Sequence, residues 1–331
     1  MPRKSAQLSH RERLENTLAG ERPDRVPVAL WRHFPVDDQS PDRLAAATSA
    51  YQGLFDFDLI KVTPSSSFCL RDWGIQDEWR GEPEGTRQYT RRVIQTPDDW
   101  LKLTLLDVTA GQLGAQLECL RLLSKSLAPR TPLVQTIFSP LSQAKNLAGP
   151  AELLVHLRKW PDAVKAGLER ISSVTINFVE EARKTGIDGI FYAVQHAQYG
   201  LLNEQEFSEF GRDFDFRVLA AASGLWLNML HLHGNQVMFS KVSDYPVQVI
   251  NWHDRHTVPS LKDALELFPG TLCGGLRQWE TLLLGNPEQV RSEALDAILA
   301  TSGRRLILGT GCVTPTTAPY GNLLAARHAV D

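Results

Sequence analysis

Short apolar runs of strand length alternate along the chain with longer segments of helical periodicity. The runs are rich in Val, Ile, Leu and aromatic residues, and they predict strands at residues 25–31, 58–63, 132–138, 187–194, 225–232, 247–252, 271–276 and 304–309. Between the later runs, apolar positions recur with a helical period, which predicts amphipathic helices at residues 151–185, 205–222 and 287–302. A first helix is expected to begin after Ser9 and to end near Gly20, because Ser9 and Glu12 have the spacing of a capping box.

The alternation of strands and helices favours a parallel sheet, because two parallel neighbours must be joined by a crossover connection. Eight such units in 331 residues have the size and the repeat number of a (β/α)₈ TIM barrel. The alternative is a doubly wound open sheet, but the Gly-x-Gly-x-x-Gly segment of its usual cofactor site does not follow the first strand. We therefore predict an α/β protein with a single barrel domain over residues 9–331, preceded by a flexible tail over residues 1–8.

One segment departs from this alternation. Residues 73–93 alternate polar and apolar positions around a turn that contains glycine and proline at 81–85, which predicts a β-hairpin inserted after the second strand. In a barrel, this insertion would lie over the mouth that the carboxyl ends of the strands form.

Composition and charge narrow the class of protein. The chain is 43% hydrophobic and 22% charged, which is typical of a globular protein and excludes disordered or collagen-like structure. A net charge of −3 argues against a nucleic-acid binder that works by neutralising phosphates. Residues 1–25 lack the apolar run of a signal peptide, and no stretch reaches the roughly 18 apolar residues of a membrane span. We therefore expect a soluble protein of the cytoplasm.

The candidate chemistry lies where the predicted strands end, since catalytic groups of barrels come from the carboxyl ends of the strands and the following loops. Six of the nine histidines fall at these positions: His33, His196, His231, His233, His253 and His256. His231 and His233 are two residues apart, so both side chains of a strand would point to the same face. Cys312 follows the last predicted strand, and a barrel mouth allows side chains from different strands to converge.

Two imidazoles and a thiolate are ligands that zinc prefers, and three protein ligands with an open fourth position are typical of a catalytic zinc site. The pattern therefore predicts that His231, His233 and Cys312 bind zinc. The alternative is structural, with the histidines hydrogen-bonded at a strand end and Cys312 packed as a small apolar residue. The other three cysteines, Cys69, Cys119 and Cys273, are expected to be packed thiols, because they are too few and too scattered for a disulfide scaffold.

Further polar side chains near the predicted mouth are candidates for substrate binding: Arg32, Lys61, His196, Tyr199, His253 and Arg255. The three cations among them would hold an anionic end of the substrate, and a solvated position at the rim is the alternative for each. His253 and Asp254 could also form a pair that orients a zinc ligand, as residues behind metal ligands commonly do. A turn at the surface is the alternative for that pair.

The order and spacing of several segments resemble the uroporphyrinogen decarboxylase superfamily, which includes zinc-dependent methylcobamide:thiol methyltransferases. The segments that carry the resemblance are residues 11–14, 23–28, 202–210, 249–252, 284–290, 308–315 and 319–323. They span most of the chain. The resemblance implies a (β/α)₈ barrel, in agreement with the alternation of strands and helices.

The same resemblance separates two branches of the superfamily. Decarboxylases carry an Arg-Gln-Ala-Gly-Arg segment whose arginines hold substrate carboxylates, and here Arg32 matches the first arginine while Val36 stands at the second. Methyltransferases carry His-x-Cys after the fifth strand and a cysteine after the eighth. This chain has His231 and Cys312 at those positions, but His233 where the first cysteine is expected. Decarboxylases carry a histidine at the position of Cys312, so this residue favours the methyltransferase branch.

The resemblance thus implies a methyltransferase that moves a methyl group from a methylated corrinoid, carried by a partner protein, to a small-molecule thiol held at zinc. An imidazole from His233 in place of a thiolate should leave the zinc more positive and the bound thiol less nucleophilic. The alternative is a metal-free lyase that decarboxylates uroporphyrinogen or another carboxylated aromatic compound, with Arg32 binding a carboxylate. A third possibility is a barrel without catalysis that only binds a tetrapyrrole.

Overall fold

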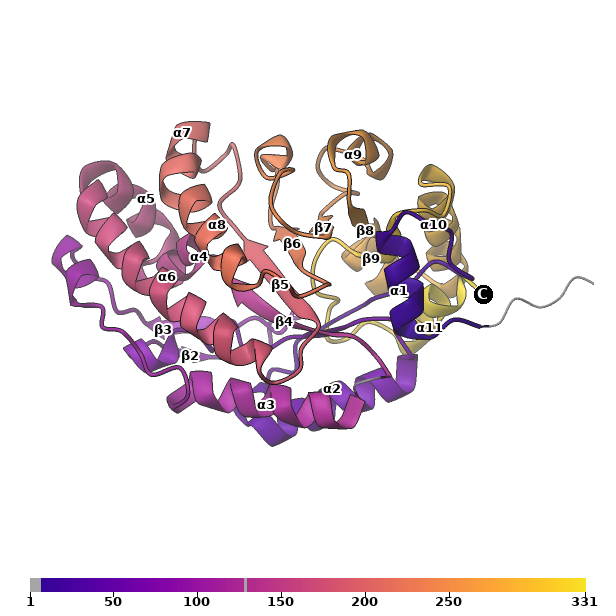
Figure 1. Ribbon diagram of the computed structural model, residues 1–331, viewed down its shortest axis with the longest axis horizontal. Coiled ribbons are helices and arrows are strands. Elements are labelled where there is room, and N and C mark those ends of the chain that lie inside the picture. Colours follow the sequence, from indigo (N-terminus) through magenta and orange to yellow (C-terminus); the bar gives the residue numbers. More distant parts are fainter. Residues whose placement is uncertain (1–6, 128–129) are drawn as a thin grey trace, which may run out of the picture.

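The computed structural model describes residues 7–127 and 130–331, and its centre is a curled sheet of parallel strands with helices around the outside (Figure 1). The sheet has the strand order β1 (Ile60–Val62), β4 (Leu133–Phe138), β5 (Gly189–Val194), β6 (Met229–Leu232), β7 (Val249–Trp252), β8 (Thr271–Leu276), β9 (Leu306–Thr310). The helices are α1 (His10–Leu18), α2 (Pro41–Phe55), α3 (Gly111–Leu127), α4 (Pro140–Ala148), α5 (Pro150–Lys159), α6 (Pro161–Arg183), α7 (Glu204–Phe207), α8 (Asp213–Ala221), α9 (Leu261–Leu267), α10 (Pro287–Ala300) and α11 (Tyr320–His328). This is a TIM-barrel-like fold. Of the tail predicted over residues 1–8, residues 1–6 lie outside the described residues.

Seven of the predicted strands are confirmed within a few residues of their expected bounds. Every residue of these seven strands is buried, which explains why they could be recognised as nearly continuous apolar runs. The first predicted helix is α1, and its capping box forms: Ser9 Oγ accepts from the Glu12 N–H, and the Glu12 carboxylate accepts from the Ser9 N–H.

The prediction of a strand at residues 25–31 is wrong. Only a single parallel bridge forms there, between Val28 and Leu308 of β9, and the Leu308 N–H donates to the Pro27 carbonyl over 2.8 Å. Pro27 has no N–H to give to a ladder, and the Val28 N–H donates to the Asp58 carboxylate over 2.8 Å instead. Seven strands are therefore assigned to the sheet. The place of the eighth predicted strand is taken by this segment, whose Ala29 N–H donates to the Leu308 carbonyl over 2.9 Å and whose Val28 carbonyl accepts from the Asp58 N–H over 2.8 Å.

Asp58 is the centre of an ionic cluster at the amino end of β1. Its carboxylate is fully buried and accepts hydrogen bonds from Arg13 Nη1 at 2.7 Å, Arg25 Nη1 at 2.6 Å and His10 Nδ1 at 2.8 Å. Burial alone would raise the pKa of Asp58, but the bonds from His10 and Arg25 hold it well below its usual range. The cluster ties α1 and the segment around Val28 to the beginning of β1.

Two of the predicted helices are interrupted in the structure. The helix expected at residues 151–185 is divided into α5 and α6 at Trp160, because Pro161 lacks an N–H and instead occupies the first position of the second helix. The segment at 205–222 consists of α7, a π-helical turn and α8. The helix expected at 287–302 is confirmed as α10, with a capping box at its start.

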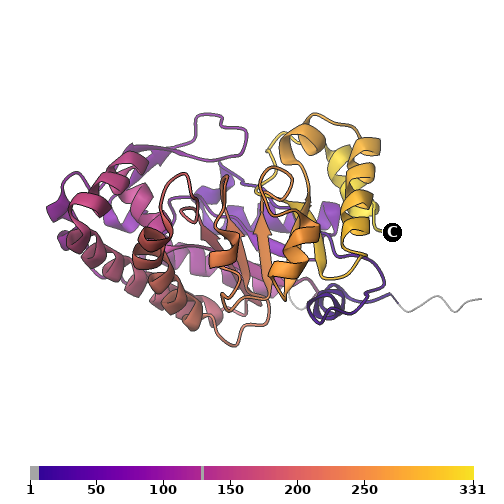
Figure 2. The ribbon, with the colours of Figure 1, turned by 90° about the horizontal axis from the view of Figure 1, so that it is seen from above.

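The predicted β-hairpin is confirmed as the antiparallel pair β2 (Gln76–Glu78) and β3 (Gln88–Arg91), which follows β1. Figure 2 shows its loop reaching toward the C-terminal part of the chain. There the Thr316 N–H donates to the Pro83 carbonyl over 2.7 Å. Gly85 has φ +79°, and a Cβ at this position would lie 2.5 Å from the Cβ of His33, so only glycine allows the loop to settle this closely.

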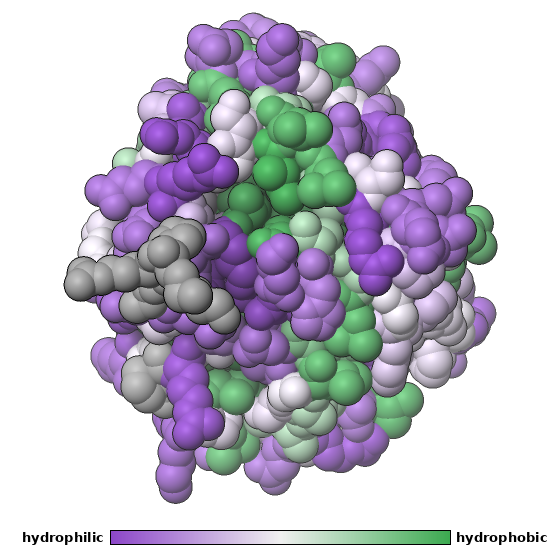
Figure 3. Space-filling view, turned by 90° about the vertical axis from the view of Figure 1, so that its right-hand side faces the viewer, coloured by the Kyte–Doolittle hydropathy of each residue, from purple (hydrophilic) through white to green (hydrophobic). Residues whose placement is uncertain are grey.

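The outer surface mixes polar and apolar side chains. Helix α10 buries Val290 against the sheet side and exposes Leu295 and Leu299 by 51% and 78%. Figure 3 shows the face at the right of Figure 1, where α10 and α11 lie, with a band of hydrophobic residues among hydrophilic ones. Within the described residues, no helix combines the length and the apolar character needed to cross a membrane.

Candidate metal centre and its cavity

Three potential metal ligands converge at the carboxyl end of the sheet. His231 lies in β6 and His233 directly follows it, so their side chains share one face of the strand, while Cys312 follows β9. Cys312 Sγ lies 3.9 Å from His231 Nε2 and 3.8 Å from His233 Nδ1. One ligand atom from each of the three residues lies within 4.8 Å of the others.

His231 is held on both sides by neighbouring strands. Its ring stacks on Phe191 of β5, with the ring centroids 5.3 Å apart and the planes inclined by 25°. On the other side, Asn251 of β7 is its register partner, and Asn251 Oδ1 lies 2.7 Å from His231 Nδ1. The second ring nitrogen, Nε2, is the one that faces Cys312.

The approach of Cys312 depends on the glycine before it. A Cβ on Gly311 would lie 2.6 Å from the Cα of His253 and 3.0 Å from the Trp252 carbonyl oxygen. No other residue fits that gap without moving β7 or the loop, because real Cβ atoms do not come this close to backbone. Gly311 therefore lets the chain after β9 pass directly over the end of β7.

Burial sets the protonation of the three ligands. It lowers the pKa of His233 to about 4 and that of His231 well below its usual value, with the neighbouring imidazoles adding to the effect. Both imidazoles are therefore neutral at pH 7 and can offer a lone pair. Burial also raises the pKa of the Cys312 thiol to about 11, so a metal that binds here must displace a proton from sulfur.

His231, His233 and Cys312 line a cavity of about 100 Å³. Trp31 and Phe191 form apolar parts of its wall, and Glu84 reaches it from the loop of the hairpin. The Glu84 carboxylate accepts a hydrogen bond from Gln278 Nε2 at 2.9 Å, and burial raises its pKa. The hairpin thus covers the cavity, as its position in the sequence predicted.

Lys61 of β1 places a cation in this cavity. Its ammonium lies 4.6 Å from the centroid of the Phe191 ring and 5.8 Å from that of Trp31, and donates to Thr63 Oγ1 at 3.3 Å. Among the described residues, no carboxylate lies within ion-pair distance of it. Burial therefore lowers the pKa of Lys61 to about 7.

The structure places three other predicted substrate residues away from the cavity. Arg32 donates to the Thr316 carbonyl at 2.9 Å and lies against an aromatic ring. Arg255 forms an ion pair with Asp296 at 2.6 Å. Tyr199 is 49% exposed and donates to a carboxylate of α7.

The two predicted histidines outside the ligand set lie closer to it. The His253 ring centroid is 5.5 Å from that of His233, and burial lowers its pKa to about 4. His196 is buried, and its pKa is lowered to about 3 by burial and by the charges of Lys145 and His233. Asp254, expected to pair with His253, instead accepts the N–H of Gly275 at 3.1 Å.

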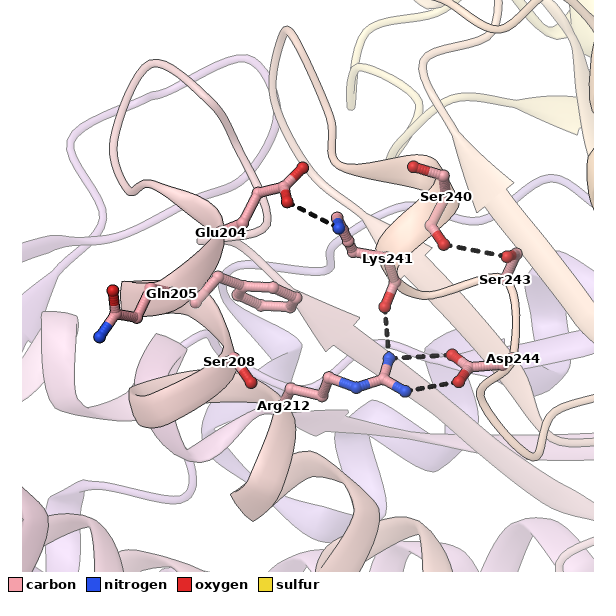
Figure 4. Close-up of a pocket in the computed structure, with 9 residues that line it drawn as sticks. Glu204, Gln205, Ser208, Arg212, Ser240, Lys241, Ser243 and Asp244 are labelled. Carbon is pink, nitrogen blue, oxygen red and sulfur yellow. Dashed lines mark hydrogen bonds and ion pairs between the residues drawn. The ribbon is translucent and has the colours of Figure 1, made fainter.

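A larger groove of about 660 Å³ lies on the surface beside α7 (Figure 4). The charged side chains that line it are paired with one another: Lys241 with Glu204 at 2.6 Å, and Arg212 with both oxygens of Asp244. No unpaired charge in this groove is therefore available to a ligand among the residues the structure describes. The smaller cavity at the ends of the strands is the better candidate for chemistry.

Two polar residues near the site, Asn251 and Glu84, are among those missed from the sequence. Asn251 is a polar residue inside a buried strand, and such a residue is expected to have a specific hydrogen-bonding role, so its position in the apolar run was an available signal. Glu84 reaches the cavity only because the hairpin folds back over the sheet. No local pattern in the sequence marks that contact.

The chain belongs to the uroporphyrinogen decarboxylase (URO-D) family, whose profile matches residues 9–331. The resemblance found in the sequence, with the methyltransferase branch as the nearer one, is thereby confirmed. Among curated proteins, the chain is 22% identical over 330 residues to the methylcobamide:CoM methyltransferase MtbA of Methanosarcina acetivorans, covering 95% of each chain.

Solved structures support the same fold. A methyltransferase from Methanosarcina mazei superposes with a TM-score of 0.85 at 19% identity, over 97% of this chain and 98% of the other. A B12-independent methionine synthase from Shewanella sp. W3-18-1 is more distant, with a TM-score of 0.55 at 14% identity, over 92% and 94% of the two chains. At these identities the likeness establishes the fold.

Proposed function

We propose that this protein is a zinc-dependent methyltransferase that moves a methyl group from a methylated corrinoid to a small-molecule thiol. The observation that carries the proposal is the convergence of His231, His233 and Cys312, whose ligand atoms lie within 4.8 Å of one another in a cavity. Membership of the URO-D family and the similarity to a protein named as a methylcobamide:CoM methyltransferase support the same reaction class.

The donor set fits zinc in kind and in spacing. Two neutral imidazoles and a cysteine are ligands that zinc accepts in catalytic sites. A tetrahedral ion with bonds of about 2.0–2.3 Å has ligand atoms roughly 3.3–3.8 Å apart. The separation of 3.8 Å from Cys312 Sγ to His233 Nδ1 lies at the upper end of that range, and the separation of 3.9 Å to His231 Nε2 lies just above it. The ligand atoms of the two histidines lie within 4.8 Å of one another, so they must approach one another when the ion binds.

In this mechanism, a bound zinc ion supplies the Lewis acidity that lets a thiol lose its proton near neutral pH. His231, His233 and Cys312 would hold the ion. Lys61 binds an anionic end of the acceptor, because a buried cation without a carboxylate partner is stabilised by an incoming anion. Trp31 and Phe191 contact the remainder of a small molecule and exclude water.

The overall transfer conserves atoms and electrons. The acceptor thiol releases its proton to solvent and forms a carbon–sulfur bond with the methyl group. The methyl–cobalt bond breaks, and its electron pair stays with the corrinoid, which a partner protein delivers to the mouth of the cavity. The corrinoid carries the demanding chemistry, while this chain supplies binding and orientation.

The alternative of a metal-free uroporphyrinogen decarboxylase has less support. A substrate with eight carboxylates requires several cations. Among the described residues that line the cavity, Lys61 is the only lysine or arginine. Arg32, the residue expected to bind a carboxylate, donates to a backbone carbonyl outside this wall.

Metal analysis and a methyl-transfer assay test the proposal. Protein isolated without chelators and supplied with zinc is expected to hold about one zinc per chain, and to lose it in His231→Ala and Cys312→Ser. The matched controls His156→Ala and Cys119→Ser change a buried histidine and a buried cysteine outside the cavity, and they should retain the metal.

The activity assay uses free methylcobalamin as methyl donor and pairs of small thiols with and without an acidic group. Methylated thiol and demethylated corrinoid should form together and only with zinc-loaded protein. Absence of zinc from the wild-type protein, or anaerobic conversion of uroporphyrinogen to coproporphyrinogen without metal, would overturn the proposal. Tight binding of a tetrapyrrole without turnover of either substrate would do the same.

A further inference from the structure

Asn251 makes three hydrogen bonds that together define how its amide is oriented. It is fully buried in β7, and its Nδ2 donates to the carbonyls of Cys273 and Thr310, each at 2.9 Å. A carbonyl can only accept, so the amide nitrogen must face these two groups. Oδ1 is therefore the atom that lies 2.7 Å from Nδ1 of His231.

From this geometry we infer that Asn251 is a positioning residue that fixes His231 as the Nδ1–H tautomer. An amide oxygen only accepts, so the short contact requires a proton on Nδ1. A neutral imidazole carries one proton, which leaves Nε2 as a bare lone pair. Nε2 is the nitrogen that faces Cys312, and a metal ligand must present an unprotonated nitrogen.

The same side chain links the two ligand-bearing segments. From β7 it contacts His231 in the neighbouring strand β6 and, on its other side, Cys273 in β8 and Thr310 in β9. Thr310 precedes Cys312 by two residues. The Asn251 amide thus fixes the position of the His231 imidazole relative to the end of β9, two residues before Cys312. For zinc binding, this inference rests on the proposed function, whereas the tautomer is a property of the metal-free protein.

The test compares Asn251→Leu, Asn251→Asp and the control Asn228→Leu. Asn228 is also buried in the sheet region, donates to the carbonyls of Ala222 and Leu225 and accepts from the Ile190 N–H, and is not part of the cavity wall. Replacing it removes a similar set of buried hydrogen bonds without touching the ligands. Asn251→Asp retains an acceptor for His231 and loses the two donations.

The first readout is the tautomer of His231 in the metal-free protein, from ¹⁵N NMR of the ring nitrogens. We expect Nδ1–H in the wild type, in Asn251→Asp and in Asn228→Leu, and an appearance of Nε2–H in Asn251→Leu. The second readout is zinc affinity, measured by competition with a chromophoric chelator. It should fall 10–100-fold in Asn251→Leu relative to Asn228→Leu, the range typical of residues behind metal ligands.

A wild-type protein with Nε2–H on His231 would overturn the inference. Equal tautomers and equal zinc affinities in Asn251→Leu and Asn228→Leu would also overturn it. If Asn251→Leu fails to fold, the wild type and Asn251→Asp still decide the tautomer. If the wild type binds no zinc but shows Nδ1–H, the methyltransferase proposal fails and the assignment of Asn251 as the tautomer-setting residue is supported.

Discussion

Replacing Asp58 with asparagine tests whether the ionic cluster at the amino end of β1 maintains the closing segment of the sheet. The carboxylate accepts hydrogen bonds from Arg13, Arg25 and His10 and from the Val28 N–H, with distances of 2.6–3.0 Å. Asparagine keeps the shape but removes the charge. Arg25 is then left without its main partner in a site where its side chain is only 8% exposed.

Removing one partner of a buried ion pair destabilises a protein by about 3–5 kcal/mol. The entropy of unfolding of a 331-residue chain is about 0.7 kcal/mol per kelvin near the melting temperature, so the expected decrease in Tm is about 4–7 °C. The assay is thermal and urea unfolding of Asp58→Asn against wild type. The control is Asp296→Asn, which breaks an exposed ion pair of 2.6 Å to Arg255 and should cost less than about 1 kcal/mol.

The pH dependence gives an independent check. The pKa of Asp58 is lower in the folded protein than its ordinary value of 3.8. Its contribution to stability is therefore fully present above about pH 4 and is lost as the pH falls further toward the folded pKa. Wild type and Asp58→Asn should converge in stability as the pH is lowered. A loss no larger than that of Asp296→Asn, or a difference that does not shrink in acid, would refute this account of the cluster.

Three further predictions concern the cavity, the hairpin and the buried core. Lys61→Met should weaken the binding of a thiol with an acidic end at least tenfold, because a hydrogen bond to a charged group is lost, and it should leave the binding of a neutral thiol of equal length unchanged. Calorimetry that shows the same loss of affinity for both thiols would contradict this. Gly85→Val should displace the hairpin loop from His33 and increase the rate at which a protease cleaves that loop. An unchanged cleavage rate would show that the contact between Gly85 and His33 is not required to hold the loop in place. Burial raises the pKa of Asp215 from 3.8 to about 7, so the contribution of this carboxyl to stability should fall as pH rises from about 4 to 7, against the rise contributed by the buried histidines whose pKa is lowered. Asp215→Asn should therefore gain stability relative to wild type over that range in urea unfolding; a difference between the two proteins that does not change with pH would contradict the shift.

The sequence was sufficient for the features that local patterns determine. Apolar runs identified the seven strands of the sheet because both faces of each are buried, and the capping box at Ser9 located α1. The run at 25–31 was misread, because the acceptor that takes the Val28 N–H is Asp58, thirty residues further along the chain. Trp160-Pro161 was a visible break between two helices, but the periodicity continued across it.

At the site, spacing predicted which residues reach the ends of the strands but could not predict where long side chains point. His231 and His233 lie two residues apart at the end of β6 and therefore share a face, and Cys312 follows the end of β9, so the three side chains converge at the carboxyl end of the sheet. Arg32 and Arg255 lie at the expected ends, yet each turns to a partner that is distant in sequence, Thr316 for one and Asp296 for the other. That choice depends on tertiary contacts that no local pattern contains.

Asp58 lies just before the short strand β1, and Lys61, three positions further along the chain, is the middle residue of that strand, but the charges around the two side chains differ. The acid is surrounded by cations that fully compensate it, while the amine has no compensating acid among the described residues. The rigidity of the scaffold is thus anchored at the end remote from the reactive groups. The side chains that line the cavity can therefore be exchanged without loss of the ion pairs that hold α1 and the segment around Val28 to the sheet.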